Sequence, residues 1–132
     1  MAGIVSWGAF IAAHRIPAST LAGKAASAGP ERSVAWSDED SITMGVEAAR
    51  RCLGERARAE VDLLVFATTT APFDEKQGAA LMATALGLSA GARTADIGNS
   101  LRCGVQALQF AHEAVLSGTC RQALVVIADC RQ

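Results

Sequence analysis

The residues best suited to chemistry lie between positions 96 and 108, where Ser100, Cys103 and Gly104 follow a short apolar segment. Their pattern predicts the end of a strand, a tight turn and then a helix over 101–116. The free amide N–H groups and the dipole of a helix start favour negative charge, so such a corner can present a nucleophile or bind a thioester oxygen or a phosphate. The same pattern is also that of one buried helix in an α/β domain, and the residues alone leave both interpretations open.

Cys103 carries the thiol at this predicted helix start. Helix starts are a known setting for reactive thiolates, which makes Cys103 a candidate nucleophile. A small side chain directly before Gly104 also suits close packing, so a buried structural cysteine is the alternative. Ser100 or Asn99 is expected to cap the helix, because either side chain can accept from the free amides of the first turn.

Composition excludes several classes of function. The chain has 132 residues, of which 51% are hydrophobic and 19% are charged, so it suits one domain with an apolar core. The net charge is −1 and no block of basic residues occurs, which argues against nucleic acid or an anionic membrane as a partner. The apolar runs 61–67 and 123–128 are far shorter than the roughly 20 residues of a membrane span, and no signal-peptide pattern is evident.

The cysteines indicate free thiols rather than a metal site or a disulfide framework. Cys52, Cys103, Cys120 and Cys130 form no C-x-x-C pair, and their spacing to the histidines matches no zinc pattern. We therefore expect reduced thiols, a cytoplasmic location and no bound metal. The acidic cluster at 37–40 is interpreted as the capped start of a helix rather than as metal ligands, with Ser37 and Asp40 as an imperfect capping box.

The predicted elements alternate in type along the chain. Strands are expected at 3–11, 61–67, 93–97 and 122–128, and helices from Ser37 to Gly54, over 75–86 and over 101–116. About twenty residues after the strand at 3–11 are expected to form a surface loop with a short helical piece near 21–26, and His14 and Arg15 lie in this loop. The order βαβαβαβ predicts an α/β fold with a mostly parallel sheet and helices on both faces.

Several stretches, in a fixed order and covering nearly the whole chain, together resemble one protein family. They are residues 3–9 (GIVSWGA), 37–49 (SDEDSITMGVEAA), 66–77 (FATTTAPFDEKQ), 100–108 (SLRCGVQAL) and 124–131 (LVVIADCR). The chain resembles the N-terminal half of a thiolase-superfamily condensing enzyme. It is most similar to hydroxymethylglutaryl-CoA synthase-like proteins of bacteria and archaea, and less similar to ketoacyl-ACP synthase III.

The resemblance carries expectations about the whole protein. The family duplicates a βαβαβαβ unit, which implies that residues 1–132 are an N-terminal half-domain whose C-terminal half is absent or lies on a separate chain. The second half would bring the catalytic histidine, since neither His14 nor His112 lies in a matching segment. The resemblance also implies a coenzyme A thioester as substrate and no tightly bound cofactor. It implies as partner either this complementary half or a second copy, in a homodimer with residues 93–97 near its two-fold axis.

Two positions depart from the family pattern. Aligning the helix places Leu101 where the family has its nucleophilic cysteine, and the turn after the second strand places Thr69 where the synthases have a general-base glutamate. Cys103 lies two residues further on, which rotates its side chain by about 200° from that of Leu101 on a helix. These changes remove covalent Claisen chemistry as the family performs it. Amide donors near Gly104 and the threonine hydroxyls of the turn are still expected to polarise a thioester carbonyl.

Two functional interpretations follow from these departures. One is an acyl-CoA enzyme for carbon–carbon bond formation or cleavage, completed by a second half or by a partner. Some thiolase-like proteins without the cysteine resemble aldol or retro-aldol catalysts that act beside a zinc-ribbon/OB-fold partner. The other is a non-catalytic thiolase-like scaffold or CoA-binding subunit. Arg32 matches the basic loop that meets the CoA nucleotide in ketoacyl synthases III, with a solvated arginine as the alternative. An α/β domain of unrelated function is the third interpretation.

Overall fold

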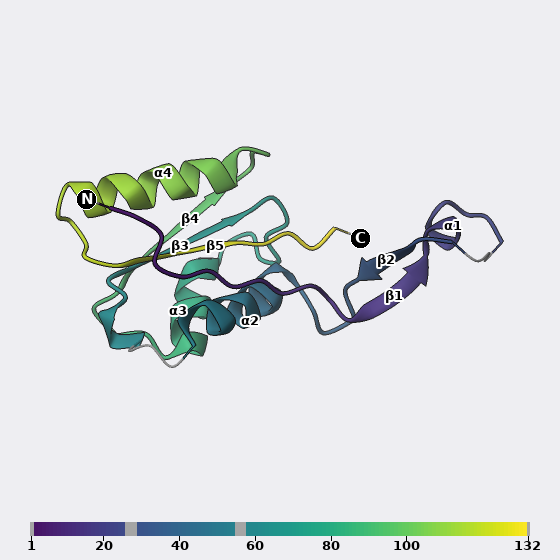
Figure 1. Cartoon of the computed structure of the whole chain (residues 1–132), viewed down its shortest axis with the longest axis horizontal. Coiled ribbons are helices and arrows are strands. Elements are labelled where there is room, and N and C mark those ends of the chain that lie inside the picture. Colours follow the sequence, from purple (N-terminus) through teal and green to yellow (C-terminus); the bar gives the residue numbers. More distant parts are fainter. Residues whose placement is uncertain (1, 26–28, 55–57, 132) are drawn as a thin grey trace.

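The computed structural model describes residues 2–25, 29–54 and 58–131. In these ranges a small sheet lies between helices, and a two-stranded hairpin extends away from this body (Figure 1). The elements in chain order are β1 His14–Pro17, α1 Ala18–Leu21, β2 Glu31–Val34, α2 Ser41–Leu53, the 3₁₀ turn η1 Arg58–Glu60, β3 Leu63–Thr68, α3 Gly78–Leu86, β4 Arg93–Gly98, α4 Cys103–Leu116 and β5 Ala123–Ile127.

The sheet of the body is parallel, as predicted. Its strand order is β4-β3-β5, with Leu64 opposite Thr94 on one side and opposite Leu124 on the other. All six residues of β3 are buried. A central strand covered by helices on both faces has no solvated side, which explains why its sequence is a continuous apolar run.

Helices cover both faces of this sheet, which confirms the predicted layers. Phe66 and Val126 face α2 and α3, where Met82 is fully buried. Val65 and Ala67 face α4 and pack in a separate cluster. Alternate residues of β3 thus pack into two separate hydrophobic clusters, one on each face of the sheet. Val105 and Leu108 of α4 are exposed, and so is Leu101 in the turn that precedes this helix.

Side-chain acceptors set the starts of α2 and α3 later than predicted, whereas α4 begins at Cys103 with no side-chain cap, so the expected cap by Ser100 or Asn99 is wrong. The box that starts α2 is made by Asp40 and Thr43, in which Asp40 Oδ1 accepts from the Thr43 N–H at 2.7 Å and Thr43 Oγ1 accepts from the Asp40 N–H at 2.8 Å. Ser37 is therefore outside the helix and the predicted Ser37 box is wrong. The predicted helix over 75–86 begins at Gly78, because Asp96 of β4 accepts from the first two amides of α3.

The predicted strand over 3–11 is not part of a sheet, so that prediction is wrong. Residues 2–12 have no strand assignment, and the first strand is His14–Pro17, which pairs antiparallel with β2 from His14↔Val34 to Pro17↔Glu31. His14 and Arg15 therefore lie in a strand and not in a loop. β-branched residues favour an extended backbone, but a strand also needs a neighbour for its N–H and C=O groups. Residues 6–9 contact α2 instead.

Candidate active site

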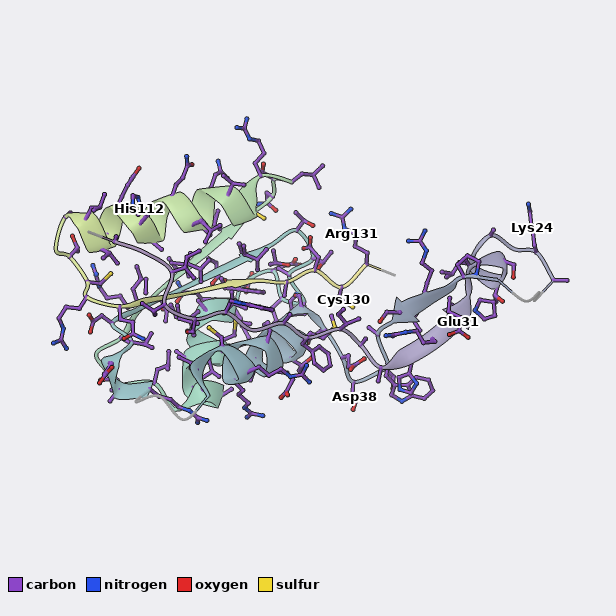
Figure 2. The ribbon with its side chains drawn as sticks, viewed as in Figure 1. Lys24, Glu31, Asp38, His112, Cys130 and Arg131 are labelled. Atoms are coloured by element: carbon purple, nitrogen blue, oxygen red, sulfur yellow. The ribbon has the colours of Figure 1, made fainter. Side chains whose placement is uncertain are left out.

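The carboxyl ends of the parallel strands meet at one edge of the sheet, which is where open α/β sheets bind ligands. Thr68 ends β3, Gly98 ends β4, and the chain continues from β5 to Asp129. Figure 2 shows Cys130 and Arg131 beyond the end of β5, while His112 lies on α4 at a distance from both. The turn that follows β3 is therefore next to the segment that follows β5.

Asp129 holds this turn through a set of hydrogen bonds to one carboxylate oxygen. Asp129 Oδ1 accepts from the Thr69 N–H at 2.7 Å, from Thr69 Oγ1 at 3.0 Å and from Thr68 Oγ1 at 3.2 Å. Burial acts to raise the pKa of Asp129, but the hydrogen bonds from Thr69 and Thr68 outweigh it and the pKa lies below its ordinary value. Asp129 is thus an ionised acceptor near neutral pH.

Thr70 is fixed by further contacts from other elements. Ser41, the first residue of α2 and fully buried, donates from Oγ to the Thr70 carbonyl at 2.9 Å. The Cys130 N–H donates to Thr70 Oγ1 at 2.8 Å, and the Thr70 N–H donates to Thr68 Oγ1 at 3.0 Å. The turn 68–70 is therefore attached to α2, to its own strand and to the segment after β5.

A cavity of about 380 Å³ opens beside this turn, within the size range of small-molecule sites. Its lining is mixed and more polar than apolar: Ile42, Phe66, Thr68, Thr69, residues 71–74, Lys76, Gly78 and residues 96–99. Lys76 Nζ lies 4.8 Å from the centre of the Phe73 ring. Asn99 has φ of 61°, a left-handed conformation that is rare for residues other than glycine and marks the turn into α4.

The structure separates Leu101 and Cys103 as predicted, but Leu101 lies in the turn and only Cys103 lies on the helix. Leu101 is 82% exposed at the turn before α4, whereas Cys103 is 4% exposed and packs in the cluster that contains Ala67 and Ala107. Cys103 is not among the residues that line the cavity. Its environment favours the packing role over the nucleophilic one. Gly104 packs closely on β5, since a Cβ there would lie 3.1 Å from a methyl group of Ile127.

Of the other predicted residues, Thr69 lies at the cavity and Arg32 does not. Thr69 is held by Asp129 and lines the cavity. Arg32 is exposed on β2, next to Glu31, and Figure 2 shows Glu31 on the hairpin that extends from the body. The structure therefore brings Thr69 to the strand ends and leaves Arg32 on the hairpin.

Sequence reasoning missed the acidic residues that organise this edge. Asp129 had a detectable signal, because it is a carboxylate immediately after an apolar strand that pairs with the strand before the threonine turn. Asp96 had none, because its partners are the amides of Gly78 and Ala79, which sequence spacing does not connect to it. Among the described residues no group of His, Cys, Asp or Glu suits a metal ion, and no helix is long and apolar enough to cross a membrane.

The relatives in sequence and the neighbours in structure are synthases that resemble one another. No family model matches the chain. The hydroxymethylglutaryl-CoA synthase of Thermococcus sibiricus is 36% identical over 136 residues, which cover 98% of this chain and 39% of that protein. A 3-oxoacyl-(acyl-carrier-protein) synthase III has a TM-score of 0.84 at 21% identity, covering 97% of this chain and 42% of the other. The priming β-ketosynthase of the R1128 polyketide pathway has a TM-score of 0.82 at 26% identity, covering 94% and 40%.

These matches agree with the sequence resemblance. Over nearly its whole length the chain is similar to condensing enzymes of the thiolase superfamily, and it has their α/β fold. It spans about 39% of the length of the curated relatives that it matches.

Proposed function

We propose that this chain is the N-terminal half of a thiolase-superfamily protein that acts on acyl-CoA thioesters in carbon–carbon bond formation or cleavage. A complementary half, on the same or a separate polypeptide, completes its site. The observation that carries this proposal is the threonine turn 68–70, fixed by Asp129 beside a cavity of about 380 Å³ at the carboxyl edge of the sheet. The similarity to hydroxymethylglutaryl-CoA synthases supports the substrate class.

The hydrogen bonds of Thr69 define what its hydroxyl can do. Thr69 Oγ1 donates its proton to Asp129 at 3.0 Å and accepts from Arg131 Nη2 at 3.4 Å, so one lone pair is left as an acceptor for a further group. In this state Thr69 does not donate to a thioester carbonyl. It is suited to accept from a substrate N–H or from a water molecule, and it cannot replace a carboxylate as a general base.

Donors for a thioester oxygen are instead available at the start of α4. No acceptor occurs among the described residues for the Gly104 and Val105 amides, as is usual in the first turn of a helix. Such amides, together with the helix dipole, stabilise negative charge that develops on a carbonyl oxygen. Gly104 is therefore proposed as a binding residue for the thioester.

The absence of a thiol at position 101 favours a reaction without an acyl-enzyme. Leu101 cannot be acylated, and Cys103 packs against the sheet with 4% exposure. Aldol or retro-aldol chemistry on a CoA thioester needs no covalent enzyme intermediate, which makes it the reaction class that fits this half. A base would then come from the complementary half.

The proposed partners follow from the same interpretation. Arg32 on the hairpin is proposed to meet the phosphates of the CoA nucleotide. A second copy pairing through the open edge of β4, or a partner with a zinc ribbon and an OB fold, would complete the assembly. Within the described residues β4 pairs only with β3, and its open edge makes association through this strand physically reasonable.

The test uses the chain and a complement from a relative. The region of the Thermococcus sibiricus synthase that this chain does not span is expressed separately and mixed with it. Acetyl-CoA with acetoacetyl-CoA, or hydroxymethylglutaryl-CoA alone, is then added and products are identified by mass spectrometry. We expect turnover only when both parts are present. The absence of turnover with a stable complex present would refute the catalytic proposal.

A non-catalytic CoA-binding scaffold is the second candidate, favoured by Leu101 and by the burial of Cys103. It predicts that the complex binds acyl-CoA, measured by calorimetry, but converts none. Mass spectrometry of the intact chain separates a third outcome. An acyl adduct on Cys103 would restore a covalent mechanism.

A further inference from the structure

Arg131 follows β5 and contacts the threonine turn at the carboxyl edge of the sheet. Its Nη2 donates to Thr69 Oγ1 at 3.4 Å and lies 3.6 Å from Asp129 Oδ2. Figure 2 shows Arg131 beyond the end of β5, next to Cys130. Among the described residues Arg131 is the one basic side chain that bonds to the turn 68–70. The guanidinium is thus held beside this turn by one hydroxyl and one carboxylate.

These contacts use only part of the guanidinium. Arginine has five N–H donors, and the contacts of Arg131 within residues 2–25, 29–54 and 58–131 involve Nη2 alone. The side chain is exposed, so its Nε and Nη1 donors can be reached by a ligand. The planar fork of an arginine matches the two oxygens of a carboxylate. Arg131 can therefore bind a carboxylate while it stays in contact with Thr69.

Asp129 does not saturate this arginine, because most of its hydrogen bonds go to the turn. Asp129 Oδ1 accepts from Thr69 and Thr68 at 2.7 to 3.2 Å, which leaves only Oδ2 for Arg131. At 3.6 Å the contact of Oδ2 with Nη2 is an ion pair but not a short hydrogen bond. A second carboxylate can therefore approach the guanidinium without displacing Asp129 from the turn.

The cavity beside the turn has three charged residues in its lining, Asp74, Lys76 and Asp96. Both oxygens of Asp96 accept from the first two amides of α3, at 2.6 and 2.8 Å, so its charge is stabilised by the start of that helix. Asp74 and Lys76 are exposed residues of one loop and have opposite charges. The lining thus places no free carboxylate at the threonine turn, where Arg131 has its free donors.

The cavity connects the threonine turn with the start of α4. Its lining includes Thr69 and also Gly98 and Asn99, which lead into this helix. A thioester whose oxygen is bound by the first amides of α4 therefore has room to extend its acyl group toward Thr69. The acyl end of the ligand, rather than its nucleotide, would then reach the guanidinium of Arg131.

We propose that Arg131 is a specificity-determining residue, which selects an acyl group with a free carboxylate over a neutral acyl group of the same size. The inference rests on the proposed function in that the ligand is an acyl-CoA thioester. The free N–H groups of Arg131 bind the carboxylate, while Thr69 and Asp129 hold the guanidinium in place. The family resemblance gives the synthases a glutamate at position 69. The threonine of this chain leaves that negative charge to be supplied by the ligand.

The probes are succinyl-CoA and the same thioester with a carboxamide in place of the free carboxylate. Calorimetry measures their affinities for the chain, alone and mixed with the region of the Thermococcus sibiricus synthase that it does not span. We expect the wild-type chain to bind succinyl-CoA about tenfold more tightly than the amide. Arg131→Gln should reduce this ratio to below about twofold by weakening succinyl-CoA alone. Arg131→Lys keeps the charge without the fork and should give an intermediate ratio.

Arg121→Gln is the matched control, because Arg121 lies just before β5, at the opposite end of the strand from Arg131. It is also exposed and also pairs with a carboxylate, at 3.9 Å from Asp62 Oδ2. The variant loses the same charge far from the turn, where salt screens its influence. Its preference for succinyl-CoA should stay within about twofold of that of the wild type. Circular dichroism of each variant checks the fold.

Each outcome supports or overturns the role of Arg131. A preference that is lost in Arg131→Gln and kept in Arg121→Gln supports it, even if no thioester is turned over, and then only the catalytic proposal fails. Equal binding of the two thioesters by the wild type, or a preference that persists in Arg131→Gln, overturns it while acyl-CoA binding stands. Equal weakening of both thioesters and of free CoA assigns Arg131 to the CoA phosphates and overturns it as well. No binding of either thioester counts against both proposals.

Discussion

Replacing Asp129 with asparagine should loosen the threonine turn and remove part of the pH dependence of stability. The substitution keeps the size of the side chain but turns the charge-assisted hydrogen bonds from Thr68 and Thr69, at 2.7 to 3.2 Å, into neutral ones. Hydrogen bonds to charged groups contribute about 1.5–3 kcal/mol and neutral ones about 1 kcal/mol. Since the Asp129 side chain is 34% exposed, the net loss is reduced by solvent.

We expect Asp129→Asn to lower the free energy of unfolding by about 1–1.5 kcal/mol at pH 7, which for a chain of this length is roughly 3–7 °C in melting temperature. Urea denaturation followed by circular dichroism measures it. Asp38→Asn is the matched control, because Asp38 loses the same charge, is exposed and makes no hydrogen bond within the described residues. Its stability should change by less than about 0.5 kcal/mol.

The pH dependence has a definite sign. The pKa of Asp129 in the folded chain lies below its ordinary value, so the unfolded chain binds a proton first as the pH falls. The stabilisation by Asp129 is complete above the ordinary pKa of about 4 and is lost as the pH falls through the lower, folded value. The wild-type chain should therefore lose stability more steeply below about pH 4 than Asp129→Asn. Equal slopes and equal stabilities in the two proteins would refute the assignment of Asp129 as the residue that fixes the turn.

Other substitutions test the remaining features. In the variant Leu101→Cys the new thiol should react with a thiol reagent within seconds, because position 101 is exposed. Cys103 of the native wild-type chain should react only on unfolding, and fast labelling of Cys103 would contradict its burial. Gly8→Ala should lower the free energy of unfolding by about 1–3 kcal/mol, because the added Cβ clashes with α2. Gly3→Ala is the control, since no atom lies within 4 Å of the added Cβ, and its stability should change little. Equal effects of the two substitutions would refute the tight packing at Gly8. Asp96→Ala should cost about 1–2 kcal/mol by removing the acceptor for the start of α3, and an unchanged denaturation midpoint would show that the cap is dispensable.

The body of the fold was predictable where sequence periodicity and burial coincide. The apolar run at 61–67 became β3 because a central parallel strand needs apolar side chains on both faces. The buried side of α4 was not predicted in the same way. Helical spacing of the apolar residues favours Leu101, Val105 and Leu108 as the buried face, but these three are exposed, and the buried side consists of Cys103, Ala107 and Ala111. The local signals for each element nevertheless led to the correct layer order, since alternating strands and helices leave few other arrangements.

The remaining features depend on contacts between distant residues. Residues 3–11 have the composition of a strand, yet strand formation is decided by the presence of a neighbour, which no local pattern reports. The start of α3 depends on Asp96, 18 positions away from Gly78. Thr69 was identified through the family resemblance, but its restraint by Asp129, 60 positions away, required the structure.

The attachment of the turn 68–70 to three separate elements has a consequence for ligand recognition. Thr68, Thr69 and Thr70 are held before any ligand arrives, by α2 through Ser41 and by the segment after β5 through Asp129. Binding of a ligand at the turn 68–70 therefore requires little further ordering of the backbone, and the conformational entropy lost on association is correspondingly small. Because the turn is preorganised, the selectivity of the site for a ligand would depend on the ligand's shape and on the fixed orientation of the threonine hydroxyl groups.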